Sequence, residues 1–395
     1  MGGGIIGLSL ALRARQLGMS VAVLERGSIG RGASHVAAGM LAPVAEAEFG
    51  HAASALLALS LRSAAQWPRF AAELLELGEI DVGLTRSGTL MLARDEDEAL
   101  ELQRQLDFRR SLGLGVERLR AGQAREREPA LAPTVRLALE APDDHSVDPR
   151  LVIRALALAC ERAGVSLLEN AEVARVELDS RGARVTGVTL ADGRQIATCE
   201  LVAAAGAWSP ELRGLPAGET VPVRPVKGQI LRLRDPAGAG MATRVLRFQG
   251  GYLVPRGDGR YVLGATVEER GYEAVPTAGG VHQLLRDAHE LIPGVSELEI
   301  EELSVGLRPG TPDNVPVIGR AGIEGLIWAS GHHRNGVLLA PVTARIVCDL
   351  LAGEPAAQAS AARPGAIGVL AAACSPERFR TQHAAPSCPV AGALS

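Results

Sequence analysis

The sequence predicts an α/β protein in which a doubly wound parallel unit is combined with an antiparallel sheet. Three observations support this fold class. Glycines at positions 2, 4 and 7 open a helix-like run that leads into an apolar strand. Strand and helix patterns alternate again near the middle of the chain and near its end. Between them, the segments GQILRLR, GGYLVPR and GRYVLGAT of residues 223–268 have the short, turn-separated pattern of antiparallel strands.

The first element is a glycine turn followed by a helix and a strand. The turn satisfies G-x-G-x-x-G, which a chain this rich in glycine contains by chance about 0.6 times, so its context matters. The next apolar positions follow helical spacing: Ile6, Leu10, Ala14 and Leu17. SVAVLER then has the composition of a buried strand and ends near Glu25, where an acid can hold the ribose hydroxyls of a dinucleotide. A glycine-rich turn beside an exposed acid is the alternative.

A strand normally precedes such a turn, but only Met1 precedes Gly2 in this sequence. In a doubly wound sheet that first strand is central. Its loss would leave unpaired buried backbone groups on two neighbouring strands. We therefore expect a strand of about 5–6 residues upstream of Met1.

The later elements are predicted in order from periodicity and from turn residues. Residues 27–45 form a loop of small residues, 52–78 a helix, 86–113 a strand and a charged helix, and 134–141 a strand. Asp148 and Pro149 begin a helix that ends at Gly164. Strands with tight turns follow over 165–208, and a helix over 279–292 comes after the antiparallel strands. Residues 302–319 are loop and strand, and 326–354 are strand, loop and helix.

Composition excludes several function classes. A net charge of −4 and 3% aromatic residues give no surface typical of nucleic-acid binding. No apolar stretch reaches the length of a membrane span, and residues 1–12 lack the basic leader of a signal peptide. The five cysteines are scattered without a C-x-x-C pair, so we expect no metal site, no disulfide framework and a reducing cytoplasm.

Six ordered segments together resemble the D-amino-acid-oxidase-like flavoproteins: GGGIIG, GRGASHVAAGMLAP, VDPRLVIRAL, VAAAGAWS, GLRPGTPDNVPVIG and GHHRNGVLLAPVTAR. Within that family AAGMLAP, GLRPGTPD and GHHRNG are most similar to the glycine oxidases of bacterial thiamine biosynthesis. The resemblance covers residues 2–353, with a short further match at 375–379. It implies a discontinuous FAD-binding domain over 1–85, 142–222 and 302–352. The substrate domain would take 86–141 and 223–301, and 353–395 would be a flexible tail.

The resemblance also implies a reaction. Glycine or a similar small amino acid is expected to be oxidised to the imine by hydride transfer to FAD, with O2 as acceptor and H2O2 as product. FAD should be dissociable, because the cysteine to which some relatives attach their flavin is absent before GLRPGTPD. A D-amino-acid dehydrogenase, a sarcosine-oxidase-like enzyme and an inactive, flavin-free relative are the alternatives. The oligomeric state stays open, with a homo-oligomer among the options.

Three side chains are expected at the substrate. Arg308 is the predicted partner of the substrate carboxylate, because a guanidinium binds a carboxylate with two parallel hydrogen bonds. A surface salt bridge is the alternative for this arginine in its Gly/Pro-rich loop. Tyr252 would donate its hydroxyl to the same carboxylate or else only pack, and Arg334 faces the substrate in the family. His332 and His333 are interpreted as loop histidines whose backbone contacts flavin.

The remaining predicted cofactor contacts follow from the matched motifs. They lie at the pyrophosphate turn, at the ribose and adenine end, in the small-residue loop and before the last helix: Gly2, Gly4, Ile5, Ile6, Gly7, Glu25, Arg26, Ala33, Ser34, Ala38, Gly39, Met40, Val173, Gly206, His332, His333, Arg334, Asn335, Gly336, Val337 and Leu338. Two positions depart from the glycine-oxidase pattern. Gly250 stands where those enzymes carry a histidine, and Val267 stands where a methionine is common.

Overall fold

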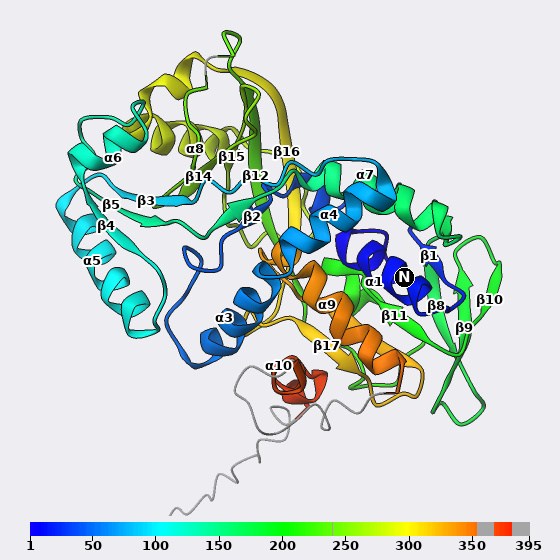
Figure 1. The fold of residues 1–395 in the computed structure, drawn as a ribbon. Coiled ribbons are helices and arrows are strands. Elements are labelled where there is room, and N and C mark those ends of the chain that lie inside the picture. The colour runs from blue at the N-terminus through cyan, green and yellow to red at the C-terminus, as the bar shows by residue number, and fades with distance from the viewer. Residues whose placement is uncertain (239, 354–366, 381–395) are drawn as a thin grey trace, which may run out of the picture.

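The structure is a computed structural model that describes residues 1–238, 240–353 and 367–380. Two bodies of secondary structure lie side by side (Figure 1). One contains a mostly parallel layer with helices packed on it, and the other contains an eight-stranded sheet. The chain crosses between them several times, so segments distant in sequence meet at their junction.

The parallel layer consists of two ladders. β1 (Ala22–Leu24) pairs in parallel with β7 (Ser166–Leu168), and β11 (Leu201–Ala203) pairs in parallel with β18 (Leu326–Ser330). β17 (Val317–Arg320) adds to β18 in the antiparallel direction. Met1 and Gly2 lie between the ladders: the Gly2 amide donates to the Leu24 carbonyl at 2.8 Å, and the Ala204 amide donates to the Met1 carbonyl at 2.9 Å. These two residues therefore join the ladders into one layer.

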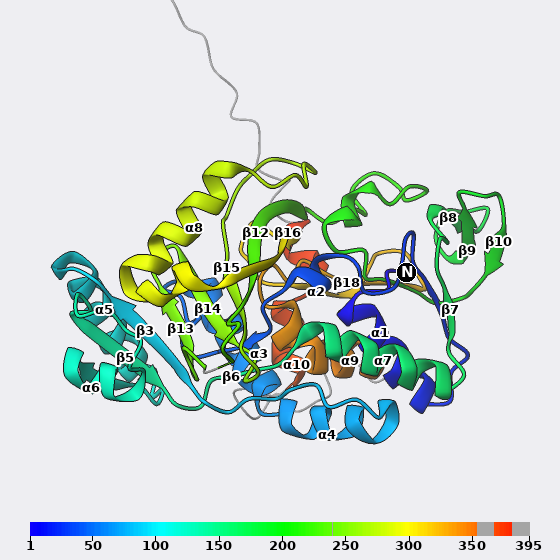
Figure 2. The same ribbon diagram turned by 90° about the horizontal axis from the view of Figure 1, so that it is seen from above.

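Each face of this layer is covered by a different structure. Helices cover one face: α1 (Ile5–Gln16), α7 (Pro149–Arg162) and α9 (Gly336–Leu351) pack on the strands, and α3 (His51–Ala64) and α4 (Trp67–Gly78) pack on these helices. A three-stranded antiparallel sheet packs on the other face: β8 (Val173–Leu178), β9 (Val185–Leu190) and β10 (Gln195–Ala197). Figure 2 shows these helices and this small sheet on opposite sides of the layer.

The eight-stranded sheet has the order β16-β12-β15-β14-β13-β3-β5-β4. The strands are β16 (Glu299–Gly310), β12 (Arg224–Arg234), β15 (Arg260–Gly264), β14 (Gly251–Pro255), β13 (Val245–Phe248), β3 (Thr89–Ala93), β5 (Leu137–Ala141) and β4 (Glu117–Arg120). Every neighbouring pair is antiparallel except β13 and β3. α8 (Ala278–Leu291) buries Leu284, Ala288 and Leu291 on this sheet, while α5 (Glu96–Ser111) and α6 (Ala121–Arg127) pack at its far end.

Three local predictions are wrong. The helix predicted over 52–78 is broken into α3 and α4, because Pro68 has no amide proton and fits only the first turn of a new helix. The loop predicted over 27–45 contains one helical turn, α2 (Ala33–Val36), and β2 (Met40–Leu41), which pairs with β6 (His145–Ser146). Arg308 lies in β16 rather than in a loop, because pairing with β12 continues through Pro309 to Gly310 and an edge strand tolerates proline.

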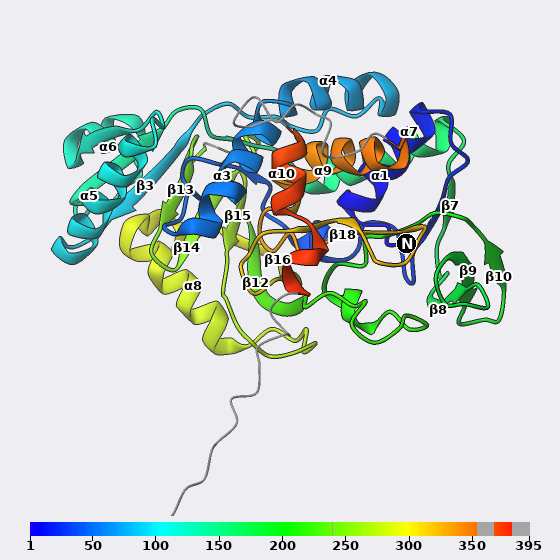
Figure 3. The ribbon, with the colours of Figure 1, turned by 90° about the horizontal axis from the view of Figure 1, so that it is seen from below.

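Part of the predicted flexible tail is ordered. α10 (Ile367–Ala373) and the 3-10 turn η3 (Pro376–Phe379) pack beside α3 and β17 (Figure 3). Leu370 and Cys374 join the core beneath the helices, and Phe379 joins the core around Trp328. The rest of the predicted tail, residues 354–366 and 381–395, lies outside the described residues. Within the described ranges, no helix is long and apolar enough to cross a membrane.

Candidate active site

One large cavity lies at the junction of the two bodies. Its volume is about 1340 Å³, and its walls come from the N-termini of α1 and α9, the loop after β1, η1 (Gly206–Glu211) and strands β12, β14 and β16. Sites for drug-sized ligands measure roughly 300–1,000 Å³. The cavity is therefore large enough for a dinucleotide and a small second ligand together.

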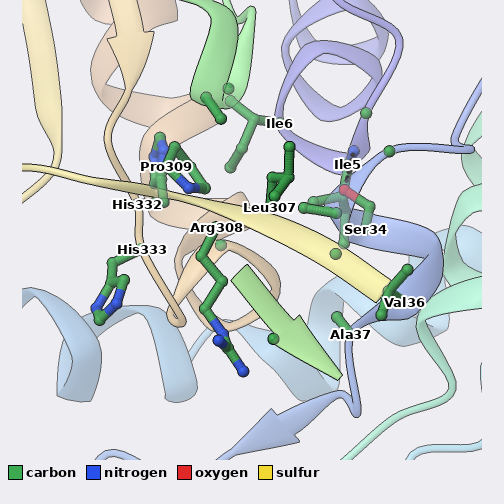
Figure 4. A pocket seen from close by; sticks show the side chains of 18 of the residues that line it. Ile5, Ile6, Ser34, Val36, Ala37, Leu307, Arg308, Pro309, His332 and His333 are labelled. Atoms are coloured by element: carbon green, nitrogen blue, oxygen red, sulfur yellow. Dashed lines mark hydrogen bonds between the residues drawn. The ribbon is translucent and has the colours of Figure 1, made fainter. Parts of the chain in front are cut away.

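The glycine turn forms one end of this cavity. Gly4, Ile5 and Ile6 line it, and a Cβ added at Gly4 would meet only the Ser34 hydroxyl, at 3.3 Å. The backbone at Gly4 is thus open for close approach by a ligand. The Ile5 amide, in the first turn of α1, donates to the same Ser34 hydroxyl at 3.1 Å (Figure 4).

Gly2 and Gly7 were expected to contact the cofactor, but neither lines the cavity. They allow the turn itself to form. A Cβ at Gly7 would lie 1.9 Å from the Gly2 carbonyl oxygen, and a Cβ at Gly2 would lie 2.3 Å from the Ala204 oxygen. Gly2 also has a φ of +102°, which side-chain-bearing residues rarely adopt.

Glu25 fixes this turn from the end of β1. Its Oε2 accepts from the Gly3 amide at 2.7 Å, and its Oε1 accepts from the Gly27 amide at 3.0 Å. Glu25 and Arg26 both line the cavity, as do Val173 and Gly206. The predicted ribose and adenine residues thus lie on one continuous wall.

The small-residue loop lines the cavity through five predicted residues: Ala33, Ser34, Ala38, Gly39 and Met40. Gly39 has a φ of +82°, and a Cβ there would lie 2.1 Å from the Val147 oxygen. Arg256, buried on the sheet side, donates to Ala38 O at 2.6 Å and to Val147 O at 2.8 Å. Arg256 therefore ties the loop to the eight-stranded sheet.

Arg308 extends from β16 at the opposite end of the cavity, on the same side as His333 (Figure 4). Its Nη1 donates to Thr266 O at 3.0 Å and, more weakly, to Lys227 O at 3.5 Å. Among the described residues no carboxylate pairs with this guanidinium, although 28 other close ion pairs form in the same part of the chain. A cation that faces a cavity with no carboxylate partner in the described part of the chain is available to an anionic ligand.

Tyr252 lies beside Arg308 in the cavity wall. Burial raises the pKa of the Tyr252 hydroxyl, while Arg308 acts in the opposite direction. The phenol therefore keeps its proton at neutral pH and can donate it to an anion that Arg308 binds.

Arg334 also lines the cavity but has protein partners. Its Nε lies 2.5 Å from Glu46 Oε2, and it pairs with Glu48 as well. Burial alone would raise the pKa of Glu46, but Arg247, Arg334 and Arg109 lower it below the ordinary value. Arg334 is thus held as part of a neutralised wall, unlike Arg308.

The two histidines before α9 are uncharged at neutral pH. Burial lowers the pKa of His332 to about 3, and its Nε2 lies 3.0 Å from the Thr343 hydroxyl. Burial, and to a smaller extent the positive charges of Arg334 and Arg308, lowers the pKa of His333 to about 4. The His333 amide donates to Pro309 O at 2.8 Å, which fixes this loop beside β16.

Several cavity residues were missed by sequence reasoning. Glu46 and Arg247 form the ion-pair wall with Arg334. The guanidinium of Arg26 lies 3.7 Å over the ring of Trp208, which in turn stacks on Tyr272. Of the missed residues, only Trp208 lies in one of the six resembling segments, VAAAGAWS, whereas Glu46, Arg247 and Tyr272 lie in none. Opposite charges and aromatic rings brought together by the fold are the only signal, and it is not visible in one sequence.

The cavity fits a dinucleotide with a pyrophosphate. The helices α1 and α9 both open onto it at their N-termini, and neither has an acidic residue in its first turn. Helix N-termini attract anions through free amides and the helix dipole. With the open backbone at Gly4, these ends provide the anion-binding surface that the cofactor needs.

Known proteins share this sequence pattern. Residues 1–350 match the family model described as FAD dependent oxidoreductase. The chain is 38% identical over 353 residues to the glycine oxidase of Geobacillus kaustophilus (strain HTA426), with 89% of this chain and 91% of that protein covered. It is 36% identical over 386 residues to the bifunctional protein ThiO/ThiG of Synechocystis sp. (strain ATCC 27184 / PCC 6803 / Kazusa), covering 96% of this chain but 54% of that protein.

Solved structures share the fold. The crystal structure of glycine oxidase from Geobacillus kaustophilus has a TM-score of 0.83 at 35% identity, and the match covers 89% of this chain and 93% of that one. The iminodiacetate oxidase from Chelativorans sp. BNC1 has a TM-score of 0.81 at 29% identity, covering 90% and 95%. The likeness therefore includes both bodies and the junction between them.

Proposed function

Because the chain belongs to the FAD dependent oxidoreductase family, we propose that its cavity oxidises glycine or a similarly small amino acid. The chain is an FAD-dependent amino-acid oxidase. The proposal concerns the substrate and the residues that bind it. The single observation that carries it is Arg308, a guanidinium at the cavity wall that has no carboxylate partner among the described residues.

FAD fits the residues of the glycine-turn end. Gly4, Ile5, Ile6 and Ser34 would hold its pyrophosphate, with Glu25 fixing the turn at Gly3. Arg26, Val173 and Gly206 would lie along the adenosine half, and the segment from His332 to Leu338 would border the flavin. When bound, FAD supplies the two-electron acceptor that takes a hydride from the substrate and is reoxidised by O2.

The substrate is held through its carboxylate. Arg308 binds the two oxygens as a planar pair, and the Tyr252 hydroxyl donates a further hydrogen bond. A side chain much larger than a hydrogen or a methyl group would lie against the ion-pair wall, in which the carboxylates of Glu46 and Glu48 balance two guanidiniums, those of Arg247 and Arg334. The site therefore favours a short amino acid.

The protein does not need a strong base. His332 and His333 are uncharged, and an amine that reaches the cavity in its neutral form already has the lone pair that drives hydride loss. With glycine, the imine would be hydrolysed by water, so that glycine, O2 and water give glyoxylate, ammonia and H2O2.

The test is a substrate panel on the purified protein. Visible flavin absorbance should copurify, and peroxide should form with glycine at a higher kcat/KM than with D-alanine. Sarcosine measured beside them separates primary from secondary amines. Bound flavin with peroxide only from sarcosine, or from none of the three, would contradict the proposed substrate. A quinone as the sole acceptor would instead favour a dehydrogenase.

We also place the enzyme in the cytoplasm and in thiamine biosynthesis. Cys160, Cys199, Cys348 and Cys374 are all free, which suits a reducing compartment. Two further relatives, of Trichormus variabilis and Nostoc, are named bifunctional ThiO/ThiG at 34% identity. Deletion of the gene should create a thiamine requirement that the intact gene relieves, whereas growth of the deletion strain without thiamine would contradict this placement.

A further inference from the structure

Lys227 is the only lysine in the chain, whose 41 lysine and arginine side chains therefore include 40 arginines. It lies on β12 and is completely buried. We propose that Lys227 is a positioning residue for the substrate-carboxylate site: through Glu268 it holds the segment whose backbone orients Arg308. This inference rests on the proposed function of Arg308.

The ammonium faces two carboxylates, of which that of Glu268 is the nearer. Its Nζ lies 3.4 Å from Glu268 Oε2 and 3.9 Å from Glu273 Oε1, and within the described residues it has no hydrogen-bond partner. A buried charge is very costly without an opposite charge nearby. The folded protein therefore needs the Glu268 carboxylate beside Lys227, and this requirement restricts the position of Glu268.

Glu268 in turn holds two neighbouring side chains, those of Thr266 and Gln229. Its Oε1 accepts from the Thr266 hydroxyl at 2.6 Å and from Gln229 Nε2 at 2.7 Å. The Lys227 amide also donates to the Glu268 carbonyl at 2.9 Å, and the Glu268 amide donates to the Lys227 carbonyl at 3.0 Å. Three of these four contacts fix residues 266–268 against β12, and the fourth, between Thr266 and Glu268, lies within the segment.

Arg308 is oriented by the same residues. Thr266 O and Lys227 O, which accept from its Nη1, belong to the two residues joined by this network. On the cavity side the guanidinium lies flat over Gly228, where a Cβ would come within 2.3 Å of Nη1. Lys227 does not line the cavity, so it acts on the substrate only through Arg308.

The residue type fits this role. An arginine brings five donors in a planar fork, which a fully buried position beside Glu268 and the half-exposed Glu273 could not satisfy. The lysine ammonium is compact and leaves the Glu268 carboxylate free to accept from Thr266 and Gln229. A chain that uses arginine at its other 40 such positions keeps lysine at this one.

Steady-state kinetics test the proposal. In Lys227→Met holoenzyme, KM for glycine should rise about five- to tenfold, the cost of one misplaced hydrogen bond, with kcat little changed. The inhibition constant of acetate, a carboxylate without an amine, should rise by the same factor, and FAD affinity should stay within about twofold. Glu268→Gln should repeat this pattern. Glu273→Gln, whose side chain is half exposed and farther from Nζ, is the matched control and should leave all four values unchanged.

A second measurement does not depend on the variants folding. Incorporation of lysine labelled with ¹³C at Cε gives one NMR signal, because there is one lysine. Addition of acetate to wild-type holoenzyme should shift that signal with the same dissociation constant as the flavin absorbance change. A signal that stays fixed at saturating acetate, or variants with unchanged KM and acetate inhibition, would overturn the inference. A wild-type enzyme that oxidises no amino acid would overturn the proposed function instead.

Discussion

At Arg308, a guanidinium faces the cavity and, among the residues that the structure describes, donates only to two backbone carbonyls. Its place in β16 makes it rigid, since pairing with β12 fixes the backbone before and after Arg308. A rigid, unpaired cation binds a planar carboxylate at a small cost in side-chain entropy. This is the physical basis for treating Arg308 differently from Arg334.

Arg308→Ala should raise KM for glycine by some tens- to several hundred-fold, because the lost charge-assisted pair is worth roughly 2–4 kcal/mol. FAD should stay bound, since the predicted pyrophosphate residues Gly4, Ile5 and Ser34 lie at the other end of the cavity. Steady-state kinetics with flavin content measured by absorbance check this. Arg345→Ala, which removes a surface arginine paired with Asp349, is the control. Near-normal turnover at low glycine in the Arg308 variant would contradict the assignment.

His332 should make the protein sensitive to acid. Its pKa is about 3 when folded and near 6.5 when unfolded, so between these values the unfolded chain binds more protons. The stability from the neutral imidazole is complete above pH 6.5 and falls as the pH drops. Between pH 7 and pH 5, wild type should lose about 2 kcal/mol more unfolding free energy than His332→Gln. Urea denaturation of both proteins in equal excess FAD measures the difference, and equal losses would refute it.

At the scale of elements, the packing of the C-terminal segment joins two cores. η3 carries Phe379 into the cluster around Leu326 and Trp328 of β18. Arg378, one residue earlier, pairs with Asp313 at 2.9 Å and donates to Val315 O at 2.7 Å. Asp313 and Val315 lie in the loop that leaves β16 after Arg308. A distant segment of sequence thus supports the strand that carries the substrate residue.

Phe379→Ala should destabilise the protein by about 3 kcal/mol, the loss expected for a buried phenylalanine in a cavity that closes only partly. Val369→Ala is the matched control on α10, because the Val369 side chain is exposed and its loss should stay within about 0.5 kcal/mol. Chemical denaturation of the two variants tests this. An equal effect of both would mean that η3 is not part of the cooperative fold.

For the whole molecule, the cavity joins the two bodies, so filling it should stabilise the protein as a unit. At FAD concentrations about 100 times the dissociation constant, binding to the folded state adds about 2.7 kcal/mol. Removing FAD should therefore lower the melting temperature, and adding it back should restore it. Glu25→Ala should show a smaller rise at the same FAD concentration, since the Gly3 amide loses its acceptor. If FAD raised the melting temperature of Glu25→Ala as much as that of wild type, the result would count against the role of Glu25.

The sequence by itself determined the elements whose signals are local. The glycine turn, helix α1, the Asp148–Pro149 start of α7 and the strands of 223–268 all follow from spacing, caps and turn residues, and the structure confirms them. Of the predicted site residues, all except Gly2 and Gly7 line the one cavity. The ordered motifs made these positions predictable, because each motif fixes a stretch of backbone that must approach a ligand closely.

Only the tertiary structure decided which charges remain free. Arg308 and Arg334 look equivalent in sequence, but Glu46 neutralises Arg334, while Arg308 has no carboxylate partner within the described ranges. The break between α3 and α4, the packing of η3 and the burial of Lys227 are decided in the same way. Each depends on which distant segment comes to lie against the residue, and the energy of a buried charge or ring is set by those neighbours rather than by its own position along the chain.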